Sequence, residues 1–286
     1  MESIVLKAYA KINLSLDVTG RRPNGYHDVK MIMQSVGLFD TLTFTKSREG
    51  INLKVDNSEL SDSTDNLIYK AAKLLFDKFD LPGGIDISLE KNIPIAAGMA
   101  GGSTDAAATF KAVNTLYDLK LSEKELCDLA VKLGADIPFC IMGGTALSEG
   151  IGEKLTPIKN PPECILLVAK PDINVSTKEV YTKLDATDLP DHPDVDAMIK
   201  AIEEGDLNKM CSLTGNVLEY VTENDHPIIS KLKQIMTGEG ALTSMMSGSG
   251  PSVFGIFNDK SKAESAFNKI KETCGLKQVY ITGFIF

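Results

Sequence analysis

The sequence has no Cys-x-x-Cys pair, and its five cysteines stand far apart. Zinc sites and the disulfide frameworks of small secreted proteins are marked by close, regular cysteine spacings. The observed spacing argues against both and is typical of reduced thiols in a cytosolic protein. The cysteines are Cys127, Cys140, Cys164, Cys211 and Cys274.

The sequence also lacks a long apolar run and an excess of basic residues. No run approaches the roughly 18 residues of a membrane helix, and "MESIVLKAYAKINLSL" lacks the basic-then-apolar order of a signal peptide. The net charge is -9, which argues against nucleic-acid binding. We therefore expect a cytoplasmic protein that binds neither nucleic acid nor a membrane. An anionic ligand stays compatible with this charge, because charges beyond a Debye length of about 8 Å are screened.

Two well-known phosphate-binding motifs are missing. The P-loop needs G-x-x-x-x-G-K-[ST], and the chain contains no Gly-Lys pair. The dinucleotide motif G-x-G-x-x-G fails as well, because both candidates, Gly150-Ile151-Gly152 and Gly248-Ser249-Gly250, lack the third glycine. A nucleotide site in this chain must therefore be built in another way.

What the sequence does have is enough length and hydrophobicity for two domains. With 286 residues and 43% hydrophobic residues, it can bury roughly 75% of its unfolded surface. Paired prolines in "TPIKNPPEC" (156–164) make poor element interiors and predict a boundary. We predict domains 1–158 and 159–286. Strands precede helices in the first and alternate with helices in the second, which indicates an α+β fold.

Apolar periodicity and capping residues predict the elements. In the first half we expect two strands within 3–19, strands at 29–36, 41–45, 51–55 and 84–90, and helices at 63–79 (Ser/Thr cap) and 103–117. A capping box of Ser122 with Glu125 begins a further helix that ends near Gly134. In the second half we expect strands at 164–169, 242–246, 252–257 and 276–285. Helices are expected between 176 and 238 and, capped by Ser261 with Glu264, near 261.

A glycine- and alanine-rich stretch, "IPIAAGMAGGSTDAAATF" (93–110), precedes one of these helices. Glycine permits positive φ and close approach of a ligand to the backbone, and a helix N-terminus offers unpaired N–H groups and about half a positive charge. Together they predict an anion site. The hydroxyls of Ser103 and Thr104 lie where a phosphate or its Mg²⁺ would bind. The alternative is a tight turn followed by an alanine helix packed against a sheet.

Three segments give the chain a family resemblance. They are "AYAKINLSLDV" (8–18), the stretch from Pro94 to Ala107, which matches P-x-x-x-G-h-G-S-S-A-A, and a late glycine turn from Ser247 to Ser252. On these motifs, in this order, the chain resembles the GHMP kinase superfamily. The glycine turn alone is as typical of a simple turn as of a site.

Within the superfamily the chain is most similar to the kinases of a cytidylyl methylerythritol. The similarity rests on "KINLSLDVTGRRPNGYHD" (11–28) above all, and on "RRPNGYHDVKMIMQSVGLFDTL" (21–42), "DNLIYKAA" (65–72), "LGADIPFC" (133–140) and "STKEVY" (176–181). The resemblance implies two α+β domains, the first like ribosomal protein S5 domain 2, with the active site in the cleft between them. It also implies transfer of the γ-phosphoryl of ATP, with Mg²⁺, to the substrate 2-hydroxyl in the non-mevalonate isoprenoid pathway. The sequence leaves the oligomeric state open, as a monomer or a homodimer.

The resemblance assigns the chemistry to Asp136 and Lys11. Asp136 would orient the hydroxyl and accept its proton, although its reference pKa of about 3.9 makes it a weak base. Lys11 would keep Asp136 ionised, lower the pKa of the hydroxyl, or meet charge on the transferring group. Asn13, on the same strand face as Lys11, would help to hold substrate hydroxyls. Taken alone, Asp136 is equally typical of a helix-end cap and Lys11 of a solvated surface.

The resemblance assigns the cytosine to aromatic residues. Tyr26 would stack on it, His27 would hydrogen-bond it, and Tyr181 would close the other face. Thr177 would contact the nucleotide or its ribose, and Gly248 of the late turn would also line the substrate. The alternative is an ordinary loop Tyr-His and a core tyrosine.

The ATP phosphates would be held by the glycine stretch, with Ser103 or Thr104 near Mg²⁺. Asn66 and Lys91 match positions near the adenine and ribose, or are solvated. One departure from the pattern is Ala100, where the family usually has glycine; alanine disfavours positive φ by about 1 kcal/mol or more, so we expect a different backbone path there. The nucleotide-binding residues implied in the stretch are Pro94, Ala97, Gly98, Met99, Ala100, Gly101, Gly102, Ser103 and Thr104.

Two other functions are compatible with parts of the sequence. A GHMP kinase for homoserine or mevalonate would share all three motifs, but a small aliphatic alcohol gives the Gly25-Tyr26-His27 loop no base to stack on. A non-catalytic nucleotide or RNA binder would fit an S5-like domain. Low basicity and the presence of both Lys11 and Asp136 argue against it.

Overall fold

The computed structural model describes residues 2–57, 60, 64–184 and 189–286. Its contacts divide the chain into two compact units. Unit 1 comprises Met1–Ala10, Leu38–Ile93 and Ala100–Gly143, and unit 2 comprises Lys11–Gly37, Pro94–Met99 and Gly144–Phe286. Two long strands, β1 (Ser3–Arg21) and β2 (His27–Ser47), therefore contribute residues to both units. Among the described residues, no helix has the length and apolarity needed to cross a bilayer.

The sheet of unit 1 contains β3 (Gly50–Val55), β4 (Gly84–Glu90) and the later part of β2. β4 runs antiparallel to β2, from the Thr41–Glu90 pair to the Ser47–Gly84 pair, and parallel to β3. Every second residue of β4 is apolar and buried, as expected for a strand with one face on a core.

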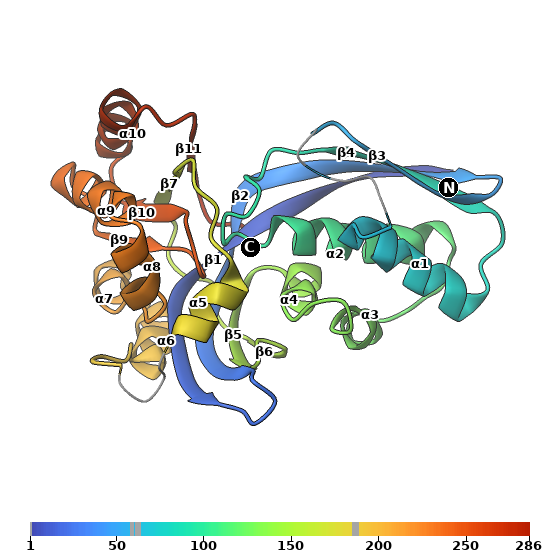
Figure 1. Cartoon of the computed structure of the whole chain (residues 1–286), viewed down its shortest axis with the longest axis horizontal. Coiled ribbons are helices and arrows are strands. Elements are labelled where there is room, and N and C mark those ends of the chain that lie inside the picture. Colours follow the sequence, from blue (N-terminus) through green and yellow to red (C-terminus); the bar gives the residue numbers. More distant parts are fainter. Residues whose placement is uncertain (1, 58–59, 61–63, 185–188) are drawn as a thin grey trace. The chain divides into compact units, whose positions relative to one another are not determined.

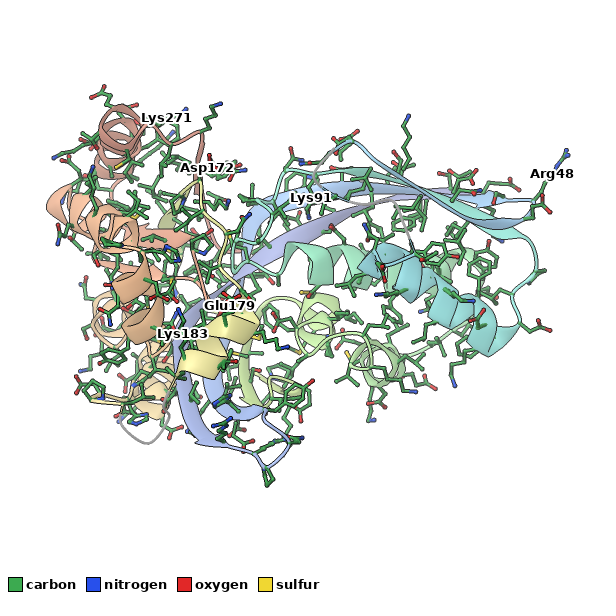
Figure 2. The ribbon with its side chains drawn as sticks, in the orientation of Figure 1. Arg48, Lys91, Asp172, Glu179, Lys183 and Lys271 are labelled. Atoms are coloured by element: carbon green, nitrogen blue, oxygen red, sulfur yellow. The ribbon has the colours of Figure 1, made fainter. Side chains whose placement is uncertain are left out.

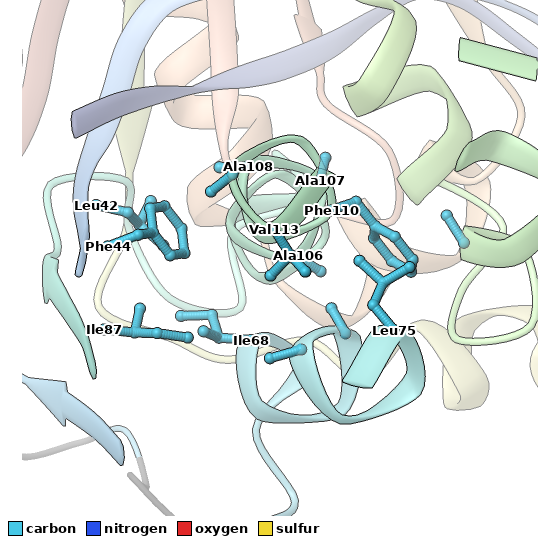
Figure 3. Packing of buried hydrophobic residues seen from close by; sticks show 14 of the residues in the cluster. Leu42, Phe44, Ile68, Leu75, Ile87, Ala106, Ala107, Ala108, Phe110 and Val113 are labelled. Carbon is cyan, nitrogen blue, oxygen red and sulfur yellow. The ribbon is translucent and has the colours of Figure 1, made fainter. Parts of the chain in front are cut away.

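Four helices complete unit 1: α1 (Leu67–Phe79), α2 (Gly101–Leu116), α3 (Glu123–Ala130) and α4 (Ile137–Met142). α1 and α2 lie side by side, and the small side chains of Ala106, Ala107 and Ala108 let α2 pack closely (Figure 3). Phe44 from β2 and Phe110 from α2 are fully buried in this core. Each would contribute roughly 3–5 kcal/mol by the usual cost of truncating a buried aromatic residue.

Unit 2 contains the first part of β2 paired antiparallel with β5 (Thr145–Gly150), which also pairs with β6 (Lys154–Pro157). The short β8 (Gly215–Asn216) runs parallel to β1. A second, antiparallel sheet has the order β11-β7-β10-β9. Its strands are β7 (Ile165–Lys170), β9 (Thr243–Met246), β10 (Val253–Phe257) and β11 (Gln278–Thr282).

Six helices belong to unit 2 within the described residues, and Figure 1 labels each of them. They are α5 (Thr177–Lys183), α6 (Val195–Glu204), α7 (Leu207–Ser212), α8 (Glu219–Asp225), α9 (Ile228–Gly238) and α10 (Lys260–Cys274). Both α9 and α10 pack on the four-stranded sheet.

Several sequence predictions are confirmed and others need correction. β4 has the predicted bounds, and the Ser122–Glu125 capping box is present. The two strands expected within 3–19 are one strand, and those at 29–36 and 41–45 are also one. Residues 145–150 and 154–157, for which no strand was expected, form β5 and β6.

Two helix caps were predicted at the wrong residue. α1 begins at Leu67 with Asn66 as its N-cap, whereas Thr64 lies in a turn and Ser63 lies outside the described residues. α10 is capped by Asp259, whose carboxylate accepts hydrogen bonds from the backbone of Ser261 and Lys262. In both cases an Asn or Asp accepts the capping bond that was assigned to a nearby hydroxyl, in line with the high N-cap preference of these residues.

Candidate functional site

Three segments far apart in the sequence meet in unit 2: β1, the loop 94–99 and the turn 247–250. The backbone N–H of Lys11 donates a hydrogen bond to the carbonyl of Met99 (3.1 Å). The Ser247 hydroxyl donates to the carbonyl of Gly98 (3.0 Å). These three segments carry the three sequence motifs, so the fold brings together motifs that lie far apart in the sequence.

Two glycines make this meeting possible. Gly98 has φ 72°, and a Cβ there would lie 2.1 Å from the carbonyl oxygen of Ser247. Gly248 has φ 57°, and its Cβ would lie 3.1 Å from the carbonyl oxygen of Gly98. The close approach leaves no room for a side chain on Gly98, and the left-handed conformation favours glycine at both positions.

Hydrogen bonds with two side chains that the sequence interpretation missed hold the backbone of the glycine turn. The Asn216 amide donates to the carbonyls of Met246 (2.9 Å) and Gly248 (2.7 Å). The carboxylate of Glu219 accepts the N–H of Met246 (2.7 Å). No local pattern marks Asn216 or Glu219 in the sequence, because their role depends on pairing with a segment about 30 residues away.

On β1, Lys11 and Asn13 project from the same face and are both buried. The Lys11 ammonium donates to Oδ1 of Asn13 (2.9 Å), and Nδ2 of Asn13 donates to Sδ of Met31 (3.1 Å). Asn13 is thus engaged at both ends of its amide. Its prediction as a ligand of substrate hydroxyls stays untested, while the observed contact is with Lys11.

The predicted cytosine residues lie partly together in unit 2. The rings of His27 and Tyr181 have centroids 5.2 Å apart at 37°, and Tyr26 is 60% exposed. His27 is buried, and its Nε2 has no hydrogen-bond partner among the described residues. Burial lowers the pKa of His27, and the charge of Arg21 lowers it further. The imidazole is therefore neutral at neutral pH.

Helix α5 connects this aromatic pair to the glycine turn. Thr177 is its first residue, and its hydroxyl lies 2.7 Å from the hydroxyl of Ser249. Tyr181 is one helical turn further along α5. Four of the predicted substrate residues, His27, Thr177, Tyr181 and Gly248, are thereby linked, and Asn13 belongs to the same compact unit.

Asp136 belongs to unit 1 and occupies the N-cap position of α4. It is half-buried, and its side chain makes no capping hydrogen bond to the helix. The interpretation of Asp136 as an ordinary helix cap is therefore not supported.

The start of α2 differs from the expectation at Ala100. Ala100 adopts φ 57° and ψ 30°, so the backbone takes the left-handed conformation that glycine would favour, at a cost of about 1–2 kcal/mol. The Thr104 hydroxyl is buried and donates to the carbonyl of Tyr9 (2.8 Å). Ser103 is half-buried, so its hydroxyl is the more accessible of the two that the sequence assigned to a metal.

Asn66 and Lys91, predicted near the adenine and ribose, both have partners inside unit 1. Asn66 accepts the N–H of Ile68 (2.9 Å) as the N-cap of α1. The Lys91 ammonium, beyond the end of β4 (Figure 2), is ion-paired with Asp40 and with Asp105 (2.8 Å). The sequence interpretation missed Asp40 and Asp105; a lone Asp after Ser-Thr gave no sign of a distant lysine.

Burial makes Asp105 an unusual acid. Desolvation raises its pKa from 3.8 to about 8, while the charge of Lys91 opposes the increase. The direction follows from the 3% exposure of its side chain and the nearby carboxylate of Asp40.

Comparison with known proteins bears on both halves of the chain. The profile of the GHMP kinases N terminal domain matches residues 66–144, and that of the GHMP kinases C terminal domain matches residues 198–276. A protein of Lachnospira eligens named 4-diphosphocytidyl-2-C-methyl-D-erythritol kinase is 51% identical over 99% of this chain and 98% of its own. A protein of that name from Lachnoclostridium phytofermentans is 50% identical over the same shares.

This chain belongs to the GHMP kinases, in the family of 4-diphosphocytidyl-2-C-methyl-D-erythritol kinases. It is a small-molecule kinase, and the predicted α+β GHMP fold is confirmed. The boundary at 158/159 stays a prediction, as do the cleft between the domains and the roles of individual residues.

Solved structures agree with this assignment. A crystal structure of 4-(cytidine 5'-diphospho)-2C-methyl-D-erythritol kinase matches the kinase with a TM-score of 0.84 and 30% identity, over 98% of this chain and 99% of that one. A homoserine kinase from Cytophaga hutchinsonii matches with a TM-score of 0.78 and 19% identity, over 99% and 95% of the two chains. The second likeness shows only a shared fold.

The raised pKa of Asp105 predicts a pH dependence of stability. Between about pH 4 and about pH 8 the unfolded chain has lost this proton and the folded protein keeps it, so this group lowers the free energy of unfolding as the pH rises. Asp105→Asn removes that contribution. The Tm of the variant relative to the wild type should therefore increase from pH 5 to pH 8 in thermal melts, whereas Asp77→Asn in an exposed pair of α1 should give no such trend. Parallel curves for Asp105→Asn and the wild type would contradict the assignment.

Proposed function

We propose that this kinase transfers the γ-phosphoryl group of ATP to the 2-hydroxyl of 4-diphosphocytidyl-2-C-methyl-D-erythritol. The observation that carries the proposal is the ring pair of His27 and Tyr181, 5.2 Å apart, in the same unit as the exposed ring of Tyr26. A nucleobase offers both a flat face for stacking and polar edges for hydrogen bonds. The names of the relatives at 51% and 50% identity support the same substrate.

The exposed ring of Tyr26 also argues for this alcohol over a smaller one. Homoserine and mevalonate have no ring that could stack on it. A cytosine ring supplies that flat face.

The nucleotide end of the site uses backbone rather than side chains. Backbone N–H groups from Gly98 to Ser103 hold the ATP phosphates, aided by the positive end of the α2 dipole. Mg²⁺ prefers oxygen ligands, and in such sites waters and substrate phosphates supply most of them. The Ser103 hydroxyl would be the protein ligand. When bound, the ion neutralises charge that develops on the phosphates.

Phosphoryl transfer then needs three tasks from the side chains. The substrate 2-hydroxyl oxygen forms a bond to the γ-phosphorus while the bond from that phosphorus to the β–γ bridging oxygen breaks, and ADP leaves with that oxygen. Asp136 orients the hydroxyl and takes its proton as the bond forms. Lys11 stabilises negative charge on the transferring group, and Asn13 holds the Lys11 ammonium in place.

The reaction would be one step of the non-mevalonate route to isoprenoid precursors. Cytoplasmic location and a monomeric or homodimeric state stay predictions.

The direct test of the substrate is an ADP-release assay with Mg-ATP and three acceptors. Turnover is expected with the cytidylyl methylerythritol and not with homoserine or mevalonate. Turnover of homoserine or mevalonate alone would replace the proposed substrate, and Mg-ATP binding without transfer to any alcohol would favour a non-catalytic nucleotide binder.

Asp136→Asn should lower kcat by about 10²- to 10⁴-fold, because the variant keeps the shape and loses the proton acceptor. The affinity for Mg-ATP should stay close to that of the wild type. The measurement is steady-state kinetics together with calorimetric binding of Mg-ADP. Wild-type kcat in the variant would remove Asp136 from the chemistry.

Tyr26→Ala should weaken binding of the cytidylyl substrate by about 1–3 kcal/mol, the usual value of one stacked base. Tyr26→Phe keeps the ring and should bind like the wild type. The KM for Mg-ATP serves as the internal control, since Tyr26 is assigned to the other substrate. An unchanged KM for the cytidylyl substrate in Tyr26→Ala would refute the stacking role.

A further inference from the structure

Unit 1 contains a buried cluster of two carboxylates and one ammonium, formed by Asp40, Lys91 and Asp105, which we call the carboxylate–lysine triad. Asp40 lies in β2, Lys91 follows β4, and Asp105 lies in the second turn of α2. The side chains of Asp40, Lys91 and Asp105 are 0%, 4% and 3% exposed. The triad therefore ties three separate elements together out of contact with water.

Its hydrogen bonds reach the backbone as well. The Lys91 ammonium donates to one oxygen of Asp40 and to Oδ2 of Asp105 (2.8 Å). The other oxygen of Asp40 accepts the N–H groups of Asn92 (2.6 Å) and Ile93 (2.8 Å). Asp40 consequently fixes the backbone that carries Lys91, and Lys91 in turn fixes Asp105.

The triad lies close to the first residue of α2. A Cβ on Gly101 would lie 2.9 Å from the Lys91 ammonium and 3.2 Å from Cγ2 of Ile93. A side chain at this position would therefore displace the lysine or Ile93. Asp40 and Asp105 hold the lysine from the other side of that gap.

We propose that Lys91 is a positioning residue, which acts through Asp105 and Gly101 to fix the N-terminus of α2, and does not contact the nucleotide. The inference rests on the proposed function, in which that helix start holds the ATP phosphates. It replaces the direct contact with adenine or ribose that the resemblance implies for this residue.

Removing the Lys91 ammonium would leave the two carboxyl groups of the triad without a cation. Without Lys91, two carboxyl groups share a dry site with no cation, which is strongly unfavourable. The first turn of α2 would then shift to relieve the crowding of the two acids. Replacing Asp105 by Asn in the same chain removes the second acidic group, and the backbone N–H groups of Asn92 and Ile93 still bond Asp40. The second substitution should therefore repair much of the damage caused by the first.

The experiment compares Lys91→Met, Asp105→Asn and the double variant by calorimetric titration with Mg-ADP. Lys91→Met should weaken binding by about 10- to 100-fold, comparable to the hundredfold that a misplacement of about 1 Å can cost a reaction rate. The double variant should recover to within a few-fold of the wild type. Lys73→Met, which breaks an exposed ion pair with Asp77 on α1, is the matched control and should change binding by less than about threefold.

Kinetics with altered nucleotides distinguish positioning from contact. If Lys91 only positions the helix, Lys91→Met lowers kcat/KM for ATP, 2'-deoxy-ATP and GTP by the same factor. A changed preference among these nucleotides, or a double variant as weak as Lys91→Met, would overturn the inference. Should Lys91→Met not fold, Gly101→Ala gives a second test: its Cβ should weaken Mg-ADP binding, and wild-type binding would contradict the role of the lysine contact.

Mg-ADP titration needs no acceptor alcohol, so the two proposals fail in different ways. Loss of binding in Lys91→Met with rescue in the double variant supports the inference even if the cytidylyl substrate is not phosphorylated. A wild-type protein that does not bind Mg-ADP would refute both the proposed function and the inference.

Discussion

The close approach of two backbone segments in unit 2, the loop 94–99 and the turn 247–250, is the constraint on which the proposed site depends. Gly98 and Gly248 meet there with no room for a side chain on Gly98. The same loop is bonded to β1 beside Lys11, and the same turn is bonded to α5 beside Tyr181 through Thr177 and Ser249. This backbone contact thus sets the positions of Lys11, proposed to stabilise charge, and of Tyr181, proposed to bind the base. The glycines are therefore required for packing as well as for ligand access.

Buried polar side chains are informative about the candidate site, because each needs a hydrogen-bond partner that compensates the loss of water. Lys11 has Asn13, and Lys91 has two carboxylates. His27 has one nitrogen for which the described residues provide no partner. The first two arrangements hold a charge in a fixed place.

The sequence predicted what depends on local patterns. Alternation predicted the bounds of β4, the spacing of Ser122 and Glu125 predicted a capping box, and the three sequence motifs indicated the family. It failed where partners are distant in the chain. Asp40 and Asp105 are 51 and 14 residues from Lys91, and Asn216 is about 30 residues from the turn that it braces. At Ala100 the local preference of alanine argued against a positive φ. The residue nevertheless has φ 57°, so the surrounding structure overrides that preference.

The proposed site requires that backbone amides at the start of α2 hold the phosphates of ATP. A crystal structure with Mg²⁺ and a non-hydrolysable ATP analogue would show whether they do. We expect N–H groups of residues 98–103 within about 3 Å of phosphate oxygens, with the Lys91 ammonium still on Asp40 and Asp105. Phosphates bound elsewhere, with these amides turned toward protein, would contradict it.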